Sequence, residues 1–149
     1  SLVKEAIKKE IPAGESILYI GHSLGGMVAQ LFAADPAMKS RYEILNITAL
    51  GSPLVYTLGR EGELHRLADT ADPIPNLSIT GIHNYTYAIS YETHGYFPFS
   101  VDAHTGSYWF ADTWGEYDCF GVKGGNAKIT FDPDDMFCYP YSDKSLIFI

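Results

Sequence analysis

The sequence predicts an α/β fold with a mostly parallel sheet, and three observations indicate it. A short apolar run at residues 15–20 has the composition of a strand that is buried on both faces, as the strands of parallel sheets are. A helical pattern of apolar residues, spaced by three and four, follows directly over residues 24–34. Two further apolar runs, at residues 44–50 and 63–68, repeat the strand signal.

The other segments give weaker or shorter signals. An amphipathic helix is predicted over residues 2–10, and the helix over 24–34 should stop at Asp35 because the residue before a proline avoids the helical region. Alternating tyrosines predict a strand within residues 83–91, and residues 92–105 are expected to be rich in loops. The signal then weakens into a hairpin or loop at 121–128 and two short candidate strands at 129–131 and 146–149.

The size and charge of the chain exclude several classes of protein. Its 149 residues suffice for one domain with a core, and 46% apolar with 19% charged residues is a globular balance. A formal charge of −8 argues against a nucleic-acid partner and against binding to an anionic membrane surface, and it is compatible with neutral substrates such as esters. No signal peptide is visible, and no apolar run has membrane-spanning length.

The cysteines and acidic clusters give no sign of a metal or a cofactor. Cys119 and Cys138 either form one disulfide or remain two thiols, and their spacing does not decide between these states. Residues 132–135 (DPDD) lack the spacing of an EF-hand calcium loop, and we interpret them as a solvated turn. We therefore expect neither a metal site nor a cofactor.

The strongest functional motif is GHSLGG at residues 21–26, at the junction of the first strand and the second helix. A G-x-S-x-G sequence between a strand and a helix is typical of a nucleophile elbow, in which a sharp turn exposes the serine hydroxyl. Ser23 is the candidate nucleophile. Gly21 and Gly25 would keep the strand and helix from colliding, and the N–H of Leu24 is the candidate oxyanion-hole donor.

A serine nucleophile needs a base and an acid that orients the base. Asp72 is the better candidate acid because it follows the strand at 63–68 in a proline-rich loop, and Asp69 is its local rival. Three histidines come after it and each remains a candidate base: His83, His94 and His104. By contrast, His22 is too close to Ser23 in sequence to act as the base, and His65 lies in a predicted strand with an expected structural role.

These motifs together resemble the fungal-type (class 3) triacylglycerol lipase family, within the α/β-hydrolase superfamily. The resemblance rests on the elbow, on ALGSP at 49–53, on RLADTADPIP at 66–75 and on VDAHTGSYW at 101–109, in that order. It implies that Asp72 is the triad acid, with Asp69 at a position where the family has Asn. It also implies that His104 is the triad histidine.

The resemblance covers roughly residues 1–110 and implies an incomplete fold. In that family, several strands, a lid and the first oxyanion donor precede the elbow, so we expect the C-terminal part of a hydrolase that lacks the N-terminal strands. The 149 residues would form one domain, with a lipase-like part at 1–110 and an unassigned extension at 111–149. The elbow strand would be an unpaired apolar edge that favours self-association or pairing with a missing half. The resemblance favours a secreted protein.

The sequence therefore predicts a serine hydrolase of the lipase or esterase type, with transient contact to a lipid interface. A non-catalytic domain that keeps the scaffold for binding or assembly is the alternative. A serine peptidase or acyltransferase is a third interpretation, because the same triad serves those reactions. Aromatic residues are expected to line an acyl groove or to pack in the core: Tyr56, Tyr96, Phe97, Phe99 and Trp109.

Overall fold

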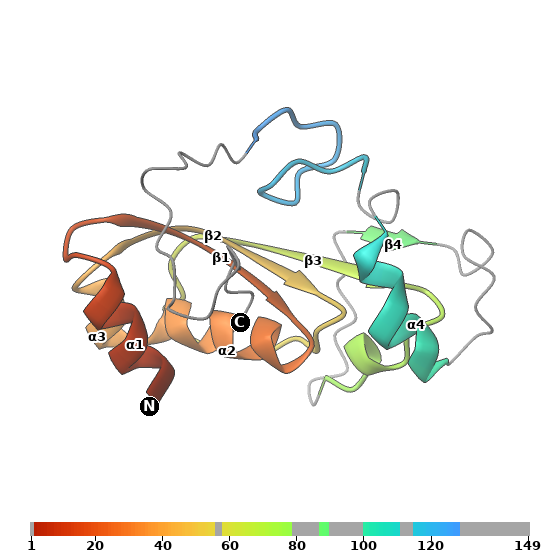
Figure 1. Cartoon of the computed structure of the whole chain (residues 1–149), viewed down its shortest axis with the longest axis horizontal. Helices are drawn as coiled ribbons and strands as arrows, with labels where there is room; N and C mark the ends of the chain where they lie inside the picture. Colours follow the sequence, from red (N-terminus) through yellow and green to blue (C-terminus); the bar gives the residue numbers. More distant parts are fainter. Residues whose placement is uncertain (1, 56–57, 79–86, 90–99, 111–114, 129–149) are drawn as a thin grey trace, which may run out of the picture.

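The computed structural model describes residues 2–55, 58–78, 87–89, 100–110 and 115–128 (Figure 1). In these residues the strands form one parallel sheet whose order follows the sequence, which confirms the predicted α/β fold. The strands are β1 (Ser16–His22), β2 (Glu43–Leu50), β3 (Glu63–Asp69) and β4 (Tyr87–Ile89).

Three helices lie on one face of this sheet (Figure 1): α1 (Leu2–Glu10), α2 (Leu24–Ala34) and α3 (Pro36–Lys39). α2 ends at Ala34, as the Asp35-Pro36 pair predicts. The short helix α3 was not predicted. It forms because the Asp35 carboxylate accepts hydrogen bonds from the N–H groups of Ala37 and Met38, and Pro36 suits the first helical turn. An ion pair from Lys4 of α1 also reaches Asp35.

The hydrophobic core lies between the sheet and these helices. Its buried side chains come from β1, from β2 and from the helices that cover them, and Tyr19 contacts Phe32 with ring centroids 6.0 Å apart. Alternate residues of β1 are buried, whereas Leu18 and Ile20 between them are only partly buried. The expected burial of both faces of β1 is thus incomplete.

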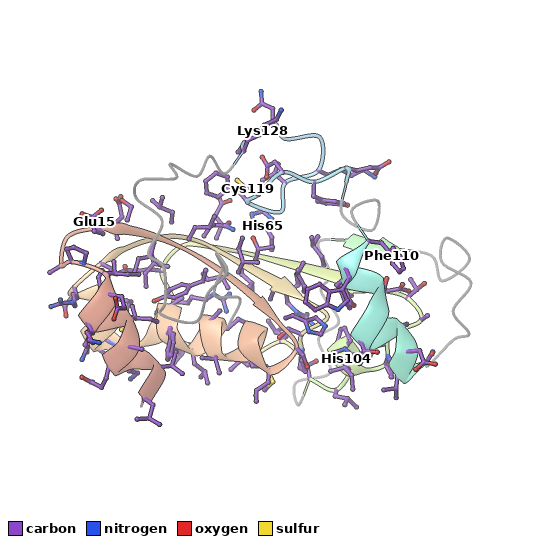
Figure 2. The ribbon with its side chains drawn as sticks, in the orientation of Figure 1. Glu15, His65, His104, Phe110, Cys119 and Lys128 are labelled. Carbon is purple, nitrogen blue, oxygen red and sulfur yellow. The ribbon has the colours of Figure 1, made fainter. Side chains whose placement is uncertain are left out.

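The opposite face of the sheet is covered by the loop at residues 115–128 (Figures 1 and 2). The amide Nδ2 of Asn46 on β2 donates a hydrogen bond to the carbonyl of Phe120 at 3.1 Å. Gly121 lies against β3, where a Cβ at this position would come within 2.6 Å of the Cβ of His65. This loop contains Cys119, whereas Cys138, the DPDD segment and the two short predicted strands lie outside the described residues.

β1 is the first strand of the sheet and pairs with β2 on one side. An apolar groove of about 330 Å³ runs beside it, between α1, β1 and α2. Its lining includes none of the predicted catalytic side chains, so the groove is not the space in which an ester would meet Ser23. Association through this edge stays a prediction, as does the division of the chain at residue 110.

Beyond the sheet, two short helical segments approach the ends of the strands: α4 (Val101–Gly106) and the 3₁₀ turn η3 (Ser107–Trp109). A further 3₁₀ turn, η1 (Ile74–Asn76), follows β3. The predicted loop over 92–105 is therefore partly wrong, because the Ser100 hydroxyl caps α4 by accepting from the N–H of Asp102 at 3.2 Å. No described helix combines the length and hydropathy of a bilayer-spanning segment.

Candidate active site

Ser23 occupies a sharp corner between β1 and α2. Its φ of 55° and ψ of −122° lie in a region that residues other than glycine rarely adopt. Among the described residues, Ser23 is the one non-glycine residue with a positive φ. Its N–H donates to the carbonyl of Leu50 at the end of β2, at 2.9 Å, which holds the strained corner against the sheet. The geometry is that of the predicted elbow.

Two glycines allow the strand and the helix to approach each other at this corner. A Cβ on Gly21 would lie 2.5 Å from the backbone of Gly25, and one on Gly26 would lie 2.6 Å from the Cβ of Ser52. Real Cβ atoms do not come so close, so neither position accepts a side chain without a backbone shift. Gly21 therefore has the spacing role that the sequence predicts.

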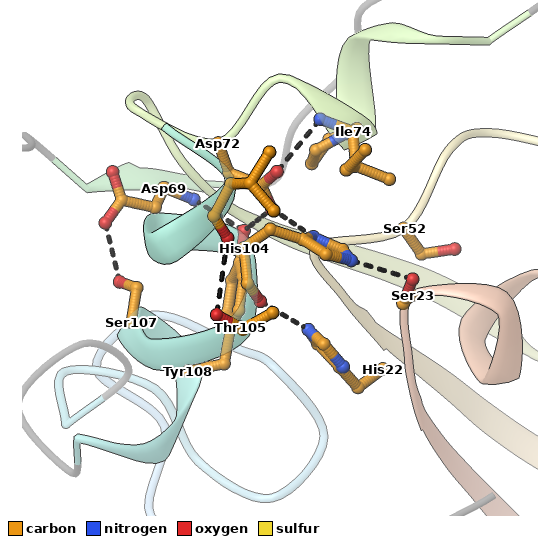
Figure 3. A network of polar contacts seen from close by, with 12 residues as sticks. His22, Ser23, Ser52, Asp69, Asp72, Ile74, His104, Thr105, Ser107 and Tyr108 are labelled. Atoms are coloured by element: carbon orange, nitrogen blue, oxygen red, sulfur yellow. Dashed lines mark hydrogen bonds and ion pairs between the residues drawn. The ribbon is translucent and has the colours of Figure 1, made fainter. Parts of the chain in front are cut away.

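His104 reaches Ser23 from the last turn of α4. Its Nε2 lies 2.8 Å from Oγ of Ser23, and its Nδ1 lies 2.9 Å from Oδ2 of Asp72 (Figure 3). An ionised carboxylate can only accept, so Nδ1 carries the hydrogen and Nε2 of the neutral ring accepts from the serine hydroxyl. The imidazole side chain is 12% exposed.

Asp72 lies in the loop after β3, and its side chain is fully buried. Besides His104, its Oδ2 accepts from the hydroxyl of Tyr108 at 2.7 Å, and its Oδ1 accepts from the N–H of Ile74 at 2.9 Å. These donors fix both carboxylate oxygens. A buried carboxylate with several donors and a histidine partner has the environment that the acid of a serine triad requires.

The structure brings Asp72, and not its rival Asp69, to His104. The Asp69 carboxylate accepts from the N–H of Ala71 at 2.8 Å and from the Ser107 hydroxyl at 2.6 Å, so it organises the loop and η3 (Figure 3). Among the other histidines, His65 lies on β3 with Glu63 at 3.3 Å from its Nε2. His83 and His94 lie outside the described residues.

The turn at residues 51–53 after β2 joins the elbow to the acid loop. Gln30 of α2 donates to the carbonyls of Gly26 at 3.1 Å and Pro53 at 3.0 Å. Arg66 of β3 donates through Nη2 to the carbonyls of Ser52 at 2.9 Å and Pro75 at 3.1 Å. Both side chains are buried, so their polar groups hold the three segments together where water is excluded.

Leu24, the expected oxyanion donor, is the first residue of α2. An N–H in the first turn of a helix has no intrahelical acceptor and lies at the positive end of the helix dipole. It is thus available to a substrate oxygen next to Ser23. Leu24 is 68% exposed, which adds apolar surface beside the serine.

Two residues of the site have roles that the sequence interpretation did not assign. Tyr108 follows His104 by four residues, a spacing that places both on one side of a helical segment and that could have indicated the contact with Asp72. His22 donates from Nε2 to the carbonyl of His104 at 2.9 Å. Burial lowers the pKa of His22 below its ordinary value, and the nearby His104 adds to this effect, which favours the neutral ring.

Of the five aromatic residues singled out in the sequence, the described part of the chain contains only Trp109. Trp109 is 76% exposed and donates from Nε1 to the carbonyl of Thr105 at 2.7 Å. The other four aromatic residues expected at an acyl groove or in the core, at positions 56, 96, 97 and 99, lie outside the described residues. The described residues contain no cluster of three or more metal-ligating side chains.

The parallel sheet with its helices and the corner at the end of β1 define an α/β-hydrolase-type domain. The chain belongs to the PGAP1-like alpha/beta domain family, whose pattern matches residues 1–88. The matched range contains Ser23 and Asp72 and ends before His104. Comparisons with curated proteins and with solved structures found no match. The narrower resemblance to class 3 lipases is not confirmed by these comparisons.

Proposed function

We propose that this protein is a serine hydrolase that cleaves carboxylic esters, of the lipase or esterase type. The observation that carries the proposal is the continuous hydrogen-bonded series from Asp72 through His104 to Ser23, with distances of 2.9 and 2.8 Å. In this proposal, Ser23 is the nucleophile, His104 is the general base and acid, and Asp72 orients the imidazole.

The chemistry of a Ser-His-Asp triad gives the order of the proposed steps. Oγ of Ser23 attacks the ester carbonyl carbon while its proton passes to Nε2 of His104, and Asp72 stabilises the imidazolium that forms. His104 then gives this proton to the departing alkoxide, which leaves the acyl group on Ser23. A water molecule, deprotonated by the same Nε2, attacks the acyl carbon, and the proton returns to Ser23 as the acid leaves.

The negative charge on the carbonyl oxygen requires a donor beside the serine. We assign this role to the N–H of Leu24, because Leu24 directly follows Ser23 at the start of α2, where a backbone N–H has no intrahelical acceptor. Loss of one such donor typically costs about 100- to 1,000-fold in rate. The acidic chain, with a formal charge of −8, favours neutral esters over anionic ones.

A fluorophosphonate probe tests the proposal directly, because it reacts with an activated serine. We expect the probe to label Ser23 and the protein to hydrolyse a short-chain p-nitrophenyl ester. Ser23→Ala and His104→Ala should abolish both. Ser40→Ala is the matched control, since Ser40 is an exposed serine whose hydroxyl donates to the carbonyl of Ala37, outside the site.

The outcomes separate the competing functions. A folded wild-type protein that neither reacts with the probe nor hydrolyses the ester refutes the proposal and favours the non-catalytic alternative. Faster turnover of amides than of matched esters would instead indicate a peptidase. Acyl transfer to an alcohol in preference to water would indicate an acyltransferase.

A further inference from the structure

His22, the last residue of β1, packs against the helical segment that carries His104. Its ring stacks on the His104 ring, with centroids 4.8 Å apart and planes inclined by 29° (Figure 3). It also lies 5.3 Å from the ring of Tyr108, at an interplanar angle of 51°. The residue before the proposed nucleophile is therefore in contact with both side chains, His104 and Tyr108, that bind Oδ2 of Asp72.

The hydrogen bond from His22 supplies a donor to a carbonyl in the last turn of α4. The last four carbonyls of a helix have no intrahelical donor. In α4, the N–H of Ser107 supplies the carbonyl of Ala103, and Nε1 of Trp109 supplies that of Thr105. Nε2 of His22 lies 2.9 Å from the carbonyl of His104, and since a carbonyl only accepts, Nε2 carries the hydrogen.

Apart from the bond between His104 and Ser23, this contact links α4 to a different element from the other contacts described above. The N–H of Ser100 donates to the carbonyl of Ala71, and the hydroxyls of Ser107 and Tyr108 bind Asp69 and Asp72. Those bonds join α4 and η3 to the acid loop after β3. His22 joins the same segment to β1, the strand that directly precedes Ser23.

We propose that His22 is a positioning residue, whose Nε2–H holds the backbone of His104 at the distance from which its ring reaches Ser23. The inference rests on the proposed function. The bonds to the acid loop keep His104 and Asp72 together. That loop is joined to the elbow through Gln30, Arg66 and the turn at residues 51–53, so these bonds set the separation between the His104 backbone and the serine only indirectly. The hydrogen bond from His22 acts on that separation, because residues 22 and 23 are adjacent on one strained turn. The stacked ring adds a flat surface that limits rotation of the imidazole of His104.

The protonation state of His22 is suited to this role. Burial and the proximity of His104 lower its pKa, whereas the bond to the His104 carbonyl and the charge of Asp72 oppose that shift. A neutral His22 donates through Nε2 without placing a second positive charge beside His104 when that ring takes the serine proton.

Two substitutions separate the hydrogen bond from the ring. His22→Phe keeps an aromatic ring and removes the donor, whereas His22→Gln keeps an amide donor near the position of Nε2 and removes the ring. We expect the Phe variant to label with fluorophosphonate and to turn over p-nitrophenyl esters roughly ten- to a hundredfold more slowly, with kcat reduced and KM little changed. The Gln variant should recover much of this loss. His65→Gln, on β3 outside the site, is the control and should react at the wild-type rate.

A second measurement does not depend on activity. The Nδ1–H of His104, bonded to Asp72, gives a proton NMR resonance that should shift or broaden in the Phe variant and stay near its wild-type position in the Gln variant. Thermal melting shows whether each variant is folded. If the Phe variant is unfolded, the Gln variant decides, since the proposal requires it to keep the resonance and most of the rate.

The results distinguish this inference from the proposed function. An unreactive wild-type protein refutes the function, and the resonance of His104 still tests the role of His22. A reactive wild-type protein together with a Phe variant of equal rate and unchanged resonance overturns the inference alone. A Gln variant slower than the Phe variant also overturns it, because the ring and not the donor would then be the important feature.

Discussion

Tyr108 donates its hydroxyl hydrogen to Oδ2 of Asp72 at 2.7 Å and accepts the N–H of Asp69 at 2.9 Å. One buried hydroxyl thus joins the loop after β3 to η3 at the point where the loop meets His104. Burial, and then the charge of Asp72, raise the pKa of Tyr108 well above its ordinary value, so the phenol stays protonated and remains a donor.

Removal of this hydroxyl should weaken both the fold and the site. We expect Tyr108→Phe to lower the free energy of unfolding by about 1–3 kcal/mol, because the N–H of Asp69 and one lone pair of Asp72 lose a buried partner. The rate of fluorophosphonate labelling should fall by roughly tenfold, which corresponds to about 1.4 kcal/mol of lost orientation of His104. Tyr42→Phe is the control: this hydroxyl donates to the carbonyl of Ile11 at 3.0 Å, away from the site. A control that slows labelling as much would contradict the assigned role.

The two aspartates of the loop should respond differently to the same substitution. In Asp72→Asn, the amide cannot hold His104 in the tautomer with hydrogen on Nδ1, and we expect kcat to fall by about 10⁴-fold. Asp69→Asn should reduce the free energy of unfolding, because its carboxylate accepts from Ala71 and Ser107, and should keep most of its activity per folded molecule. Urea denaturation and ester hydrolysis measure the two effects. Equal losses of kcat in both folded variants would refute the assignment of Asp72.

The elements around the elbow could be predicted because local sequence determines them. Apolar periodicity and the Asp35-Pro36 pair identified β1 and α2 to within two residues at each end. The spacing of the motif likewise identified Ser23 as the corner residue. These features depend on backbone preferences of neighbouring residues, which a single sequence contains.

The parts of the fold and of the site that the sequence does not predict depend on contacts between distant segments. The choice of His104 among three histidines came from a family resemblance and not from its own environment, and the contact of His22 with its carbonyl joins residues 82 positions apart. The sequence predicts a loop-rich segment where α4 forms, because glycine and proline punctuate it and a helix of six residues is too short for apolar periodicity to indicate. The position of residues 115–128 on one face of the sheet likewise results from tertiary packing. The periodicity of apolar residues in the sequence does not predict such packing.

Gly51, directly after β2, leaves room for the side chains of Tyr108 and Asp72 to pack against the backbone. Its φ is +55°, and a Cβ there would lie 2.6 Å from Cε2 of Tyr108 and 2.9 Å from Oδ2 of Asp72. We expect Gly51→Ala to lower the free energy of unfolding by about 1–2 kcal/mol because of the left-handed backbone, and by roughly 1–3 kcal/mol more because of overpacking. Labelling of Ser23 should also become slower.

Gly124→Ala is the matched control for this glycine, because its φ of +70° carries the same backbone cost and a Cβ there would meet nothing within 4 Å. In urea denaturation, the free energy of unfolding of this variant should fall only by the cost of the left-handed backbone. Its Ser23 should react with the fluorophosphonate probe at the wild-type rate. Equal destabilisation of the two variants would show that the contact with Tyr108 contributes nothing.

The lowered pKa of His22 predicts a dependence of stability on pH. Its folded pKa lies below the unfolded value of 6.5, chiefly because of burial, so between the two values the unfolded chain binds more protons. The corresponding stability is fully present above pH 6.5 and is lost as the pH falls through the folded pKa. Besides burial, the proximity of the His104 ring lowers this pKa, whereas the hydrogen bond to the His104 carbonyl and the charge of Asp72 raise it. We therefore expect the urea midpoint of the wild-type protein to fall between pH 7 and 5 more steeply than that of His22→Gln.

Ser23→Ala is the control for this comparison, since it keeps His22 stacked on His104 and removes only the hydroxyl. Its midpoint should follow the wild-type dependence on pH, with a constant offset at most. The difference in urea midpoint between wild type and His22→Gln is therefore diagnostic. If this difference stays constant from pH 7 to 5, His22 takes up its proton equally in the folded and unfolded chains. Such a result would remove the reason to treat the His22 ring as neutral beside His104.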